Sequence, residues 1–262
     1  MAEGRKSISY CGRGRIHPGG TTGYLALDKT NKYIVLSFRG TVSVENRNTD
    51  LDFQHVDASS VCKGCQAHHG FWEASKAAMG VLLPKVEEAL HENPDYRIVL
   101  TGHSLGGALA TLGAVTLRNA GHTVDLVSHL VTRKGKRTTT NKDQYSFGAP
   151  SVGNKAFADY ITQSTAGKNY RITHTSDEVP KVLFRSSRRA PLDRIVPEYS
   201  QSSPEYWITS PNGVSATKSD IRVIEGVNNE AGNLGTPGIT MDPHGWYMGD
   251  MSVCAQTWKD WE

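Results

Sequence analysis

Short apolar runs alternate along this chain with longer stretches in which apolar residues recur at helical spacing. Runs of β-branched and aromatic residues bounded by turn residues predict buried strands at 33–38, 96–100, 145–148, 170–174, 205–209 and 221–225. Helical spacing predicts helices at 71–90, where Pro84 should introduce a kink, at 108–120 and at 154–163. Strands that alternate with helices of this length predict an α/β fold, with a mostly parallel central sheet covered by helices on both faces.

Length and composition favour one globular domain over residues 1–262. The chain is 37% hydrophobic and 21% charged, which is ordinary for a protein that buries a sizeable core. It shows no internal repeat and no low-complexity linker, so we place no domain boundary. No apolar run approaches the length of a membrane-spanning helix. The N-terminal MAEGRKSISYCG also lacks the apolar region of a signal peptide.

The basic character of the chain is local. Its formal net charge is +3, but residues 127–144 alone carry five Lys and Arg side chains against one Asp, a net of +4. The rest of the chain therefore has a net charge of −1. This distribution gives no reason to expect a nucleic-acid partner.

The four cysteines favour structural disulfides. Cys62 and Cys65 form a CxxC, which is also found in redox motifs and zinc sites, but no second CxxC is present and the flanking DASSVCKGCQAHHG is a polar loop. Pairing Cys11 with Cys254 would tie the two ends of the chain together. Closing so long a loop contributes about 5 kcal/mol in the chain-entropy model. Cysteines used in this way indicate an oxidising compartment.

A candidate nucleophile lies in the segment Gly102-His103-Ser104-Leu105-Gly106, which fits the pattern G-x-S-x-G. The pattern alone is weak, because a glycine turn can simply pack a helix on a strand. Here a predicted buried strand precedes it and an alanine-rich helix follows it, which is the setting of a nucleophile elbow. The sharp turn explains the glycines at both flanks. The backbone N–H of Leu105 is then placed to bind an oxyanion.

A serine hydroxyl needs a base to accept its proton, and in such folds the acid and the histidine follow the serine in that order. His244 is the one histidine that lies beyond Asp177, in the loop MDPHGWYMG. His103 is expected to point away from Ser104, and His174 lies within a predicted strand. His244 is therefore the predicted base, against the alternative of an ordinary surface residue.

The acid should lie on a loop that follows a late strand. Asp177, just beyond YRITHT, has the best position, although it could also serve as a helix cap or turn residue. Asp193, Asp220 and Asp242 compete on chain order alone. Asp242 is only two residues from His244, which is too close in sequence for the group that orients the imidazole.

Five segments together resemble the class 3 lipases of filamentous fungi, a family that also includes feruloyl esterases: GHSLGGALAT, YSFGAPSVGN, YRITHTSDEVP, SSPEYWI and PHGWYMG. The resemblance runs from about Tyr10 to Cys254. It implies a catalytic triad of Ser104, Asp177 and His244. Because SFRGT matches the family turn SFRG-Ser/Thr, it also implies an oxyanion hole formed by Thr41 and Leu105.

The resemblance further implies a secreted serine esterase that needs no metal or cofactor, and we expect a monomer. Its disulfides would join Cys11 to Cys254 and Cys62 to Cys65. The favoured substrate is a triacylglycerol, cleaved through an acyl-enzyme. The alternatives are a feruloyl or other soluble ester, and a catalytically inactive lipid-binding homologue.

Two segments depart from the family pattern. Residues 42–53 correspond to the lid that binds the lipid–water interface in family lipases, but the lid is polar here, with Arg47 where lipases tend to carry tryptophan. We therefore expect weak binding to an oil surface. Residues 127–144 interrupt the expected strand DLYSFGAP and form an insertion foreign to the family. Their codons can encode fungal splice and branch-point signals, so we interpret the stretch as a retained intron, which sequencing of the transcript would test.

Overall fold

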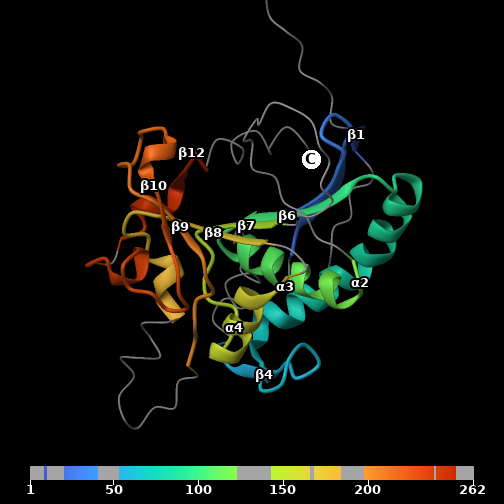
Figure 1. The fold of residues 1–262 in the computed structure, drawn as a ribbon, viewed down its shortest axis with the longest axis horizontal. Helices are drawn as coiled ribbons and strands as arrows, with labels where there is room; N and C mark the ends of the chain where they lie inside the picture. The colour runs from blue at the N-terminus through green and yellow to red at the C-terminus, as the bar shows by residue number, and fades with distance from the viewer. Residues whose placement is uncertain are drawn as a thin grey trace, which may run out of the picture.

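The computed structural model describes residues 9–10, 21–40, 53–122, 143–165, 168–183, 198–238 and 240–251. Eight of the described strands form one sheet in the order β1–β2–β3–β6–β7–β8–β9–β10 (Figure 1). Their bounds are Ser9–Tyr10 (β1), Gly23–Asp28 (β2), Tyr33–Phe38 (β3), Arg97–His103 (β6), Asp143–Phe147 (β7), Lys168–His174 (β8), Glu205–Ile208 (β9) and Ile221–Ile224 (β10). The pairs from β3 to β9 are parallel and the outer pairs are antiparallel. The predicted α/β fold with a mostly parallel sheet is confirmed.

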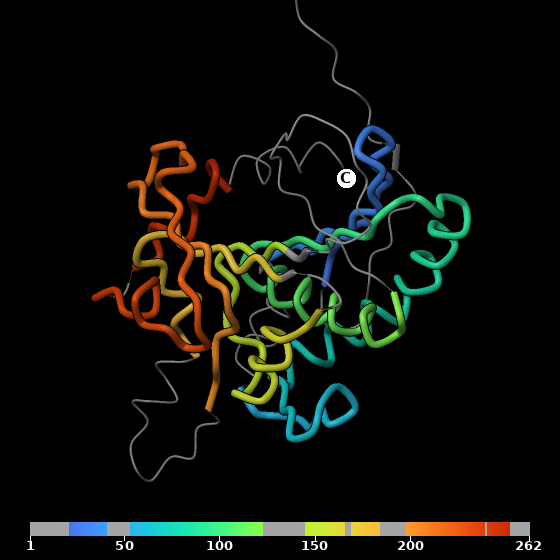
Figure 2. Tube along the Cα trace, in the orientation of Figure 1, coloured from blue at the N-terminus to red at the C-terminus, as the bar shows by residue number. Residues whose placement is uncertain are grey.

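Three α-helices are described, with the bounds His69–Glu92 (α2), Leu105–Asn119 (α3) and Lys155–Gln163 (α4). All three lie on the same side of the sheet in Figure 1, so helical cover of the second face stays a prediction. The helix α2 continues through Pro84 as one helical span. The chain runs from β2 and β3 (blue) at one end of the sheet to β9, β10 and the last described residues (orange to red) at the other (Figure 2).

The helix α3 forms the centre of the core, between the sheet and α2. Thirteen of its fifteen residues are buried, which requires small side chains because neighbouring elements approach it closely. A Cβ built on Gly113 would lie 3.0 Å from Leu100 Cδ2 and 3.2 Å from Met79 Sδ. The alanine- and glycine-rich sequence of this helix therefore sets how near it lies to β6 and α2.

The polar segment around the CxxC forms a small hairpin of β4 (His55–Asp57) and β5 (Gln66–His68). A disulfide joins Cys62 to Cys65 at its tip. Cys11 and Cys254 lie outside the described residues, so their pairing stays a prediction. The remaining short elements are Val179–Lys181 (η1), Lys218–Asp220 (η2), Asn233–Gly235 (η3), Asp242–Gly245 (η4), Trp246–Tyr247 (β11) and Gly249–Asp250 (β12).

The strand β7 begins two residues before the predicted start at residue 145. Gln144 pairs with Leu100 of β6 on one side and with Asn169 of β8 on the other, and the ladder to β8 extends the strand to Asp143, which pairs with Lys168. The last two residues of the 127–144 insertion thus belong to the sheet. Residues 127–142 lie outside the described part of the chain.

Candidate active site

Ser104 occupies the sharp bend between β6 and α3. Its backbone has φ 57° and ψ −129°, a left-handed conformation that is uncommon for a residue with a side chain. Holding a residue there costs of order 1–3 kcal/mol, and such strain clusters at functional sites. The bend places Ser104 directly before the N-terminus of the fifteen-residue helix α3.

The two glycines of the motif allow this bend to pack against β3. A Cβ built on Gly102 would lie 2.2 Å from the carbonyl carbon of Gly106. A Cβ built on Gly106 would lie 2.2 Å from the carbonyl oxygen of Phe38. Because both contacts are with backbone atoms, which cannot move aside cheaply, the packing requires glycine at both positions. The tight turn therefore has no room for a side chain at either flanking position, as the G-x-S-x-G pattern predicts.

The ends of two neighbouring strands flank Ser104. The Ser104 N–H donates to the carbonyl of Phe147 at the end of β7, at 2.9 Å. On the other side, a Cβ built on Gly40 would lie 3.4 Å from Ser104 Cβ, so the segment after β3 also reaches the serine. Thr41, the predicted oxyanion-hole residue, follows Gly40 but lies outside the described residues. Leu105, the other predicted donor, is the first residue of α3, where backbone N–H groups have no intrahelical acceptor.

The predicted base and acid are in contact. Nδ1 of His244 lies 2.9 Å from Oδ2 of Asp177, which is fully buried, whereas the His244 side chain is 12% exposed. The second carboxylate oxygen of Asp177 accepts from the Val179 N–H at 2.9 Å. A buried carboxylate that bonds Nδ1 fixes the ring orientation and leaves Nε2 for proton transfer.

Tyr247 supplies a further hydrogen bond to the acid. Its hydroxyl donates to Oδ2 of Asp177 at 2.5 Å. Burial, followed by the negative charge of Asp177, raises the pKa of the Tyr247 hydroxyl well above its usual value. The phenol therefore keeps its proton and remains a donor. Chain order could not indicate this partner, although Tyr247 lies in the same PHGWYMG segment as His244.

Gly148 links the serine to the acid–base pair. It follows Phe147, whose carbonyl binds the Ser104 N–H, and has a φ of +56°. A Cβ built on it would lie 2.7 Å from Tyr247 Oη, 2.9 Å from Asp177 Oδ2 and 3.1 Å from His244 Cε1. Two consecutive residues at the end of β7 thus make both contacts. Phe147 binds the Ser104 N–H, and Gly148 lies against the acid–base pair. The three predicted catalytic residues are gathered around this point.

The side chain of His103 lies beside His244, a contact that its position before Ser104 does not predict. Its ring centroid is 4.4 Å from that of His244, and its Nε2 is 2.8 Å from the His244 carbonyl oxygen. The local sequence predicts that its side chain points away from Ser104 and indicates no role for it. The contact spans 141 positions of the chain, so no local pattern could have identified it.

The competing acids have other positions. Asp220 is partly exposed and forms a capping box with Thr217 at η2. Asp242 is exposed in the first turn of η4, beside His244 in sequence. Asp193 lies outside the described residues, as do residues 42–52 of the predicted lid. Among the described residues, Asp177 is the carboxylate hydrogen-bonded to His244.

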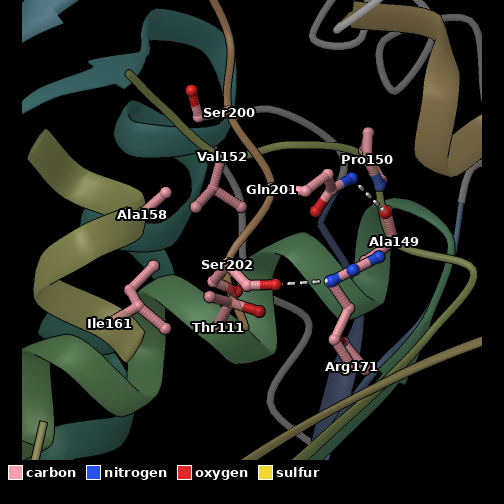
Figure 3. A pocket seen from close by; sticks show the side chains of 11 residues that line it. Thr111, Ala149, Pro150, Val152, Ala158, Ile161, Arg171, Ser200, Gln201 and Ser202 are labelled. Carbon is pink, nitrogen blue, oxygen red and sulfur yellow. Dashed lines mark hydrogen bonds between the residues drawn. The ribbon is translucent and has the colours of Figure 1, made fainter. Parts of the chain in front are cut away.

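A separate polar pocket lies under the segment that follows Gly148, between α3, α4 and residues 200–202 (Figure 3). Arg171 Nε donates to the Ser202 carbonyl at 2.9 Å, and Gln201 Nε2 donates to the Pro180 carbonyl at 2.7 Å. None of the predicted catalytic residues lines it. These hydrogen bonds join residues 200–202 to β8 and to η1. They do not add a reactive group to the candidate active site.

The described ranges contain no group of three or more His, Cys, Asp or Glu side chains that could hold a metal ion. Within the same ranges, no helix combines the length and hydrophobicity needed to cross a membrane.

Comparison with known proteins gives one consistent family. The model of the family described as Lipase (class 3) matches residues 35–187. The chain is 40% identical over 231 residues to a secreted mono- and diacylglycerol lipase A of Penicillium cyclopium, covering 87% of this chain and 66% of that protein. It is 36% identical to a secreted mono- and diacylglycerol lipase 1 of Fusarium solani, covering 93% of this chain and 64% of that protein. The chain thus spans just under two thirds of the length of these relatives.

Solved structures agree with the sequence comparisons. A mutant form of the Penicillium cyclopium protein MDLA superimposes with a TM-score of 0.72 at 38% identity, covering 89% of this chain and 76% of that one. A mono- and diacylglycerol lipase from Aspergillus oryzae superimposes with the same TM-score at 36% identity, covering 90% and 78%. Both the fold and the sequence of the chain are therefore similar to those of fungal lipases.

Proposed function

The chain belongs to the class 3 lipase family, and from that premise we propose that it hydrolyses acylglycerol esters with Ser104 as the nucleophile. The family resemblance by itself favours triacylglycerols. The names of the Penicillium and Fusarium relatives favour mono- and diacylglycerols, and we adopt these as the proposed substrates. Those relatives are also named as secreted, which supports an extracellular location.

In the proposed acylation step, His244 Nε2 takes the proton of the Ser104 hydroxyl as the oxygen attacks the ester carbonyl. The tetrahedral oxyanion is bound by the backbone N–H of Leu105 and by Thr41. His244 then gives its proton to the leaving glycerol oxygen, and the C–O bond breaks to leave an acyl group on Ser104. Water, activated by the same imidazole, hydrolyses this acyl-enzyme and returns the proton to Ser104.

Asp177 stabilises the imidazolium that forms on His244 in both steps. Its carboxylate is buried and accepts from His244, Tyr247 and Val179, so it is held in one orientation. The bond to His244 Nδ1 selects the tautomer with a free Nε2 lone pair, which is the atom that the mechanism uses. The proposed role of Asp177 is therefore electrostatic and orienting, without proton transfer to the carboxylate.

The observation that carries the proposal is the position of Gly148. Its backbone contacts the acid–base pair and directly follows the residue that binds the Ser104 N–H. A degenerate lipase fold that only binds lipid has no need to keep a strained serine beside a buried His–Asp pair. This combination favours an enzyme over the inactive homologue.

A fluorophosphonate probe tests the proposal. The wild-type chain should be labelled at Ser104, and a Ser104→Ala variant should not be labelled. Turnover should then be compared on monoacyl-, diacyl- and triacylglycerols and on a feruloyl ester. Labelling without turnover of any acylglycerol would contradict the substrate, and absence of labelling would contradict catalysis by Ser104 altogether.

A further inference from the structure

Two histidines outside the proposed triad contact the backbone of the loop that carries His244. Nε2 of His103 lies 2.8 Å from the His244 carbonyl oxygen, and Nδ1 of His174 lies 3.2 Å from the Pro243 carbonyl oxygen. A carbonyl oxygen only accepts, so a ring nitrogen that bonds it must carry the proton. The two histidines end β6 and β8, so the loop that carries His244 lies against the ends of two strands of the sheet.

The His103 contact joins the serine segment to the base by a short path. His103 precedes Ser104 in the chain, and its hydrogen bond ends on the backbone of His244 itself. His103 and its hydrogen bond thus connect the Ser104 backbone to the His244 backbone. Together with the packing around Gly148, this connection restricts the distance between the nucleophile and the base. Sites held by strands are more precise than sites held by loops alone.

His103 also has a charge state suited to this position. Burial, and then the positive charge on His244, lower the pKa of the His103 imidazole to about 4. The ring is therefore neutral at neutral pH and has one N–H, which the His244 carbonyl receives. A cation there would lie beside the imidazolium that forms on His244 during acyl transfer, with ring centroids 4.4 Å apart.

We propose that His103 is a positioning residue for the general base. Its neutral Nε2–H holds the backbone of His244 and thereby sets the distance from the His244 ring to Ser104. This inference rests on the proposed hydrolytic function and adds to it a residue that touches neither the substrate nor the transferred proton. The two ring nitrogens of His174 lie near the carbonyl oxygens of Pro243 and Ser210, at 3.2 and 2.7 Å. A neutral imidazole can donate to only one of them, so the proposal is confined to His103.

The test compares His103→Leu, which removes the donor, with His103→Gln, whose amide nitrogen can replace Nε2. Because a misplacement of about 1 Å can lower a rate by roughly 100-fold, we expect kcat of His103→Leu to fall by about 10- to 100-fold. KM should stay within about twofold, since ground-state binding is unaffected. His103→Gln should recover kcat to within about threefold of the wild type.

His68→Asn is the matched control. His68 is also fully buried, but it accepts from the Phe71 N–H at the start of α2 and stacks on Phe71, away from the His244 loop. This variant should lower the thermal midpoint and leave kcat of the folded enzyme unchanged. A kcat of His103→Leu equal to that of the wild type would overturn the inference. Equal losses in His103→Leu and His103→Gln would overturn it as well, because the N–H would then not be the cause.

NMR of the ring nitrogens gives a readout that does not need activity. We expect His103 to carry its proton on Nε2, with Nδ1 unprotonated, between about pH 6 and 8. An imidazolium, or the tautomer with the proton on Nδ1, would overturn the inference whether or not the chain hydrolyses esters. If the wild type fails to hydrolyse any ester while the NMR result is as expected, the proposed function fails and the placement of His103 stands.

Discussion

Replacing Gly148 by alanine should damage the acid–base pair while leaving the fold in place. The added Cβ would meet Tyr247 Oη at 2.7 Å, Asp177 Oδ2 at 2.9 Å and His244 Cε1 at 3.1 Å. Ordinary contacts of a carbon atom with such neighbours lie near 3.5 Å. The backbone and the three side chains must therefore separate by about 0.4 to 0.8 Å.

A displacement of this size should lower kcat strongly but leave the protein folded. A shift of about 1 Å can lower a rate by roughly 100-fold, so we expect kcat to fall by about 30- to 100-fold. Alanine at the left-handed φ of +56° also costs roughly 1–2 kcal/mol of unfolding free energy. Such a loss leaves a domain of ordinary stability folded.

Gly121→Ala separates the two effects. Gly121 has a comparable φ of +83°, and a Cβ built on it meets nothing within 4 Å. Gly121→Ala should lose roughly 1–2 kcal/mol in denaturant unfolding, the cost of the left-handed backbone. Gly148→Ala should lose roughly 1–3 kcal/mol more, because its Cβ overpacks the site. Turnover of a diacylglycerol should fall only in Gly148→Ala. Equal kcat values for the two variants would refute the claim that the end of β7 holds the acid–base pair in place.

Three further changes have defined outcomes. Asp177→Asn should lower kcat by about 10³- to 10⁴-fold, because the amide selects the wrong His244 tautomer, and a loss below tenfold in steady-state hydrolysis would contradict this role. Tyr247→Phe leaves Asp177 with one donor fewer and should cost roughly 1.5–3 kcal/mol in urea unfolding, the contribution of a hydrogen bond to a charged group; an unchanged midpoint would exclude that bond. Deleting residues 127–144 joins Leu126 to Tyr145 and brings a leucine to the position where Gln144 pairs with buried Leu100. Since burying a leucine contributes roughly 1.5–3 kcal/mol, the shortened chain should unfold at a higher urea concentration, and a lower midpoint would contradict the insertion hypothesis.

Local patterns predicted the centre of the sheet because its strands are short runs of β-branched and aromatic residues bounded by turn residues. The predicted strand 33–38 has the bounds of β3, and the predicted helix 71–90 lies within α2. The strand β2 was missed, since Gly23 and Asp28 at its ends disfavour strands and its pairing with β3 supplies what its composition lacks. The start of β7 differs for a similar reason, because pairing with β6 and β8 extends it to Gln144 and pairing with β8 extends it to Asp143.

The choice of acid shows what chain order can and cannot decide. Order alone left four aspartates open, and position after a strand favoured Asp177. The physical distinction is that Asp177 is fully buried with donors on both oxygens, whereas Asp220 is partly exposed and caps its own turn. Burial of a carboxylate depends on which distant donors the fold brings to it, and these donors come from residues up to 70 positions away.

The place of His103 follows from the same limit. Alternation along a strand predicts that the His103 side chain points away from that of Ser104, but it says nothing of what approaches the strand end from elsewhere. Parallel strands bring their carboxyl ends to one edge of a sheet, where the loops after β6, β7 and β8 meet. A polar residue that ends such a strand next to a nucleophile therefore faces the loops that supply the other reactive groups. The imidazole of His103 meets the His244 loop for this reason, and the donor that it provides is set by topology and not by the local sequence.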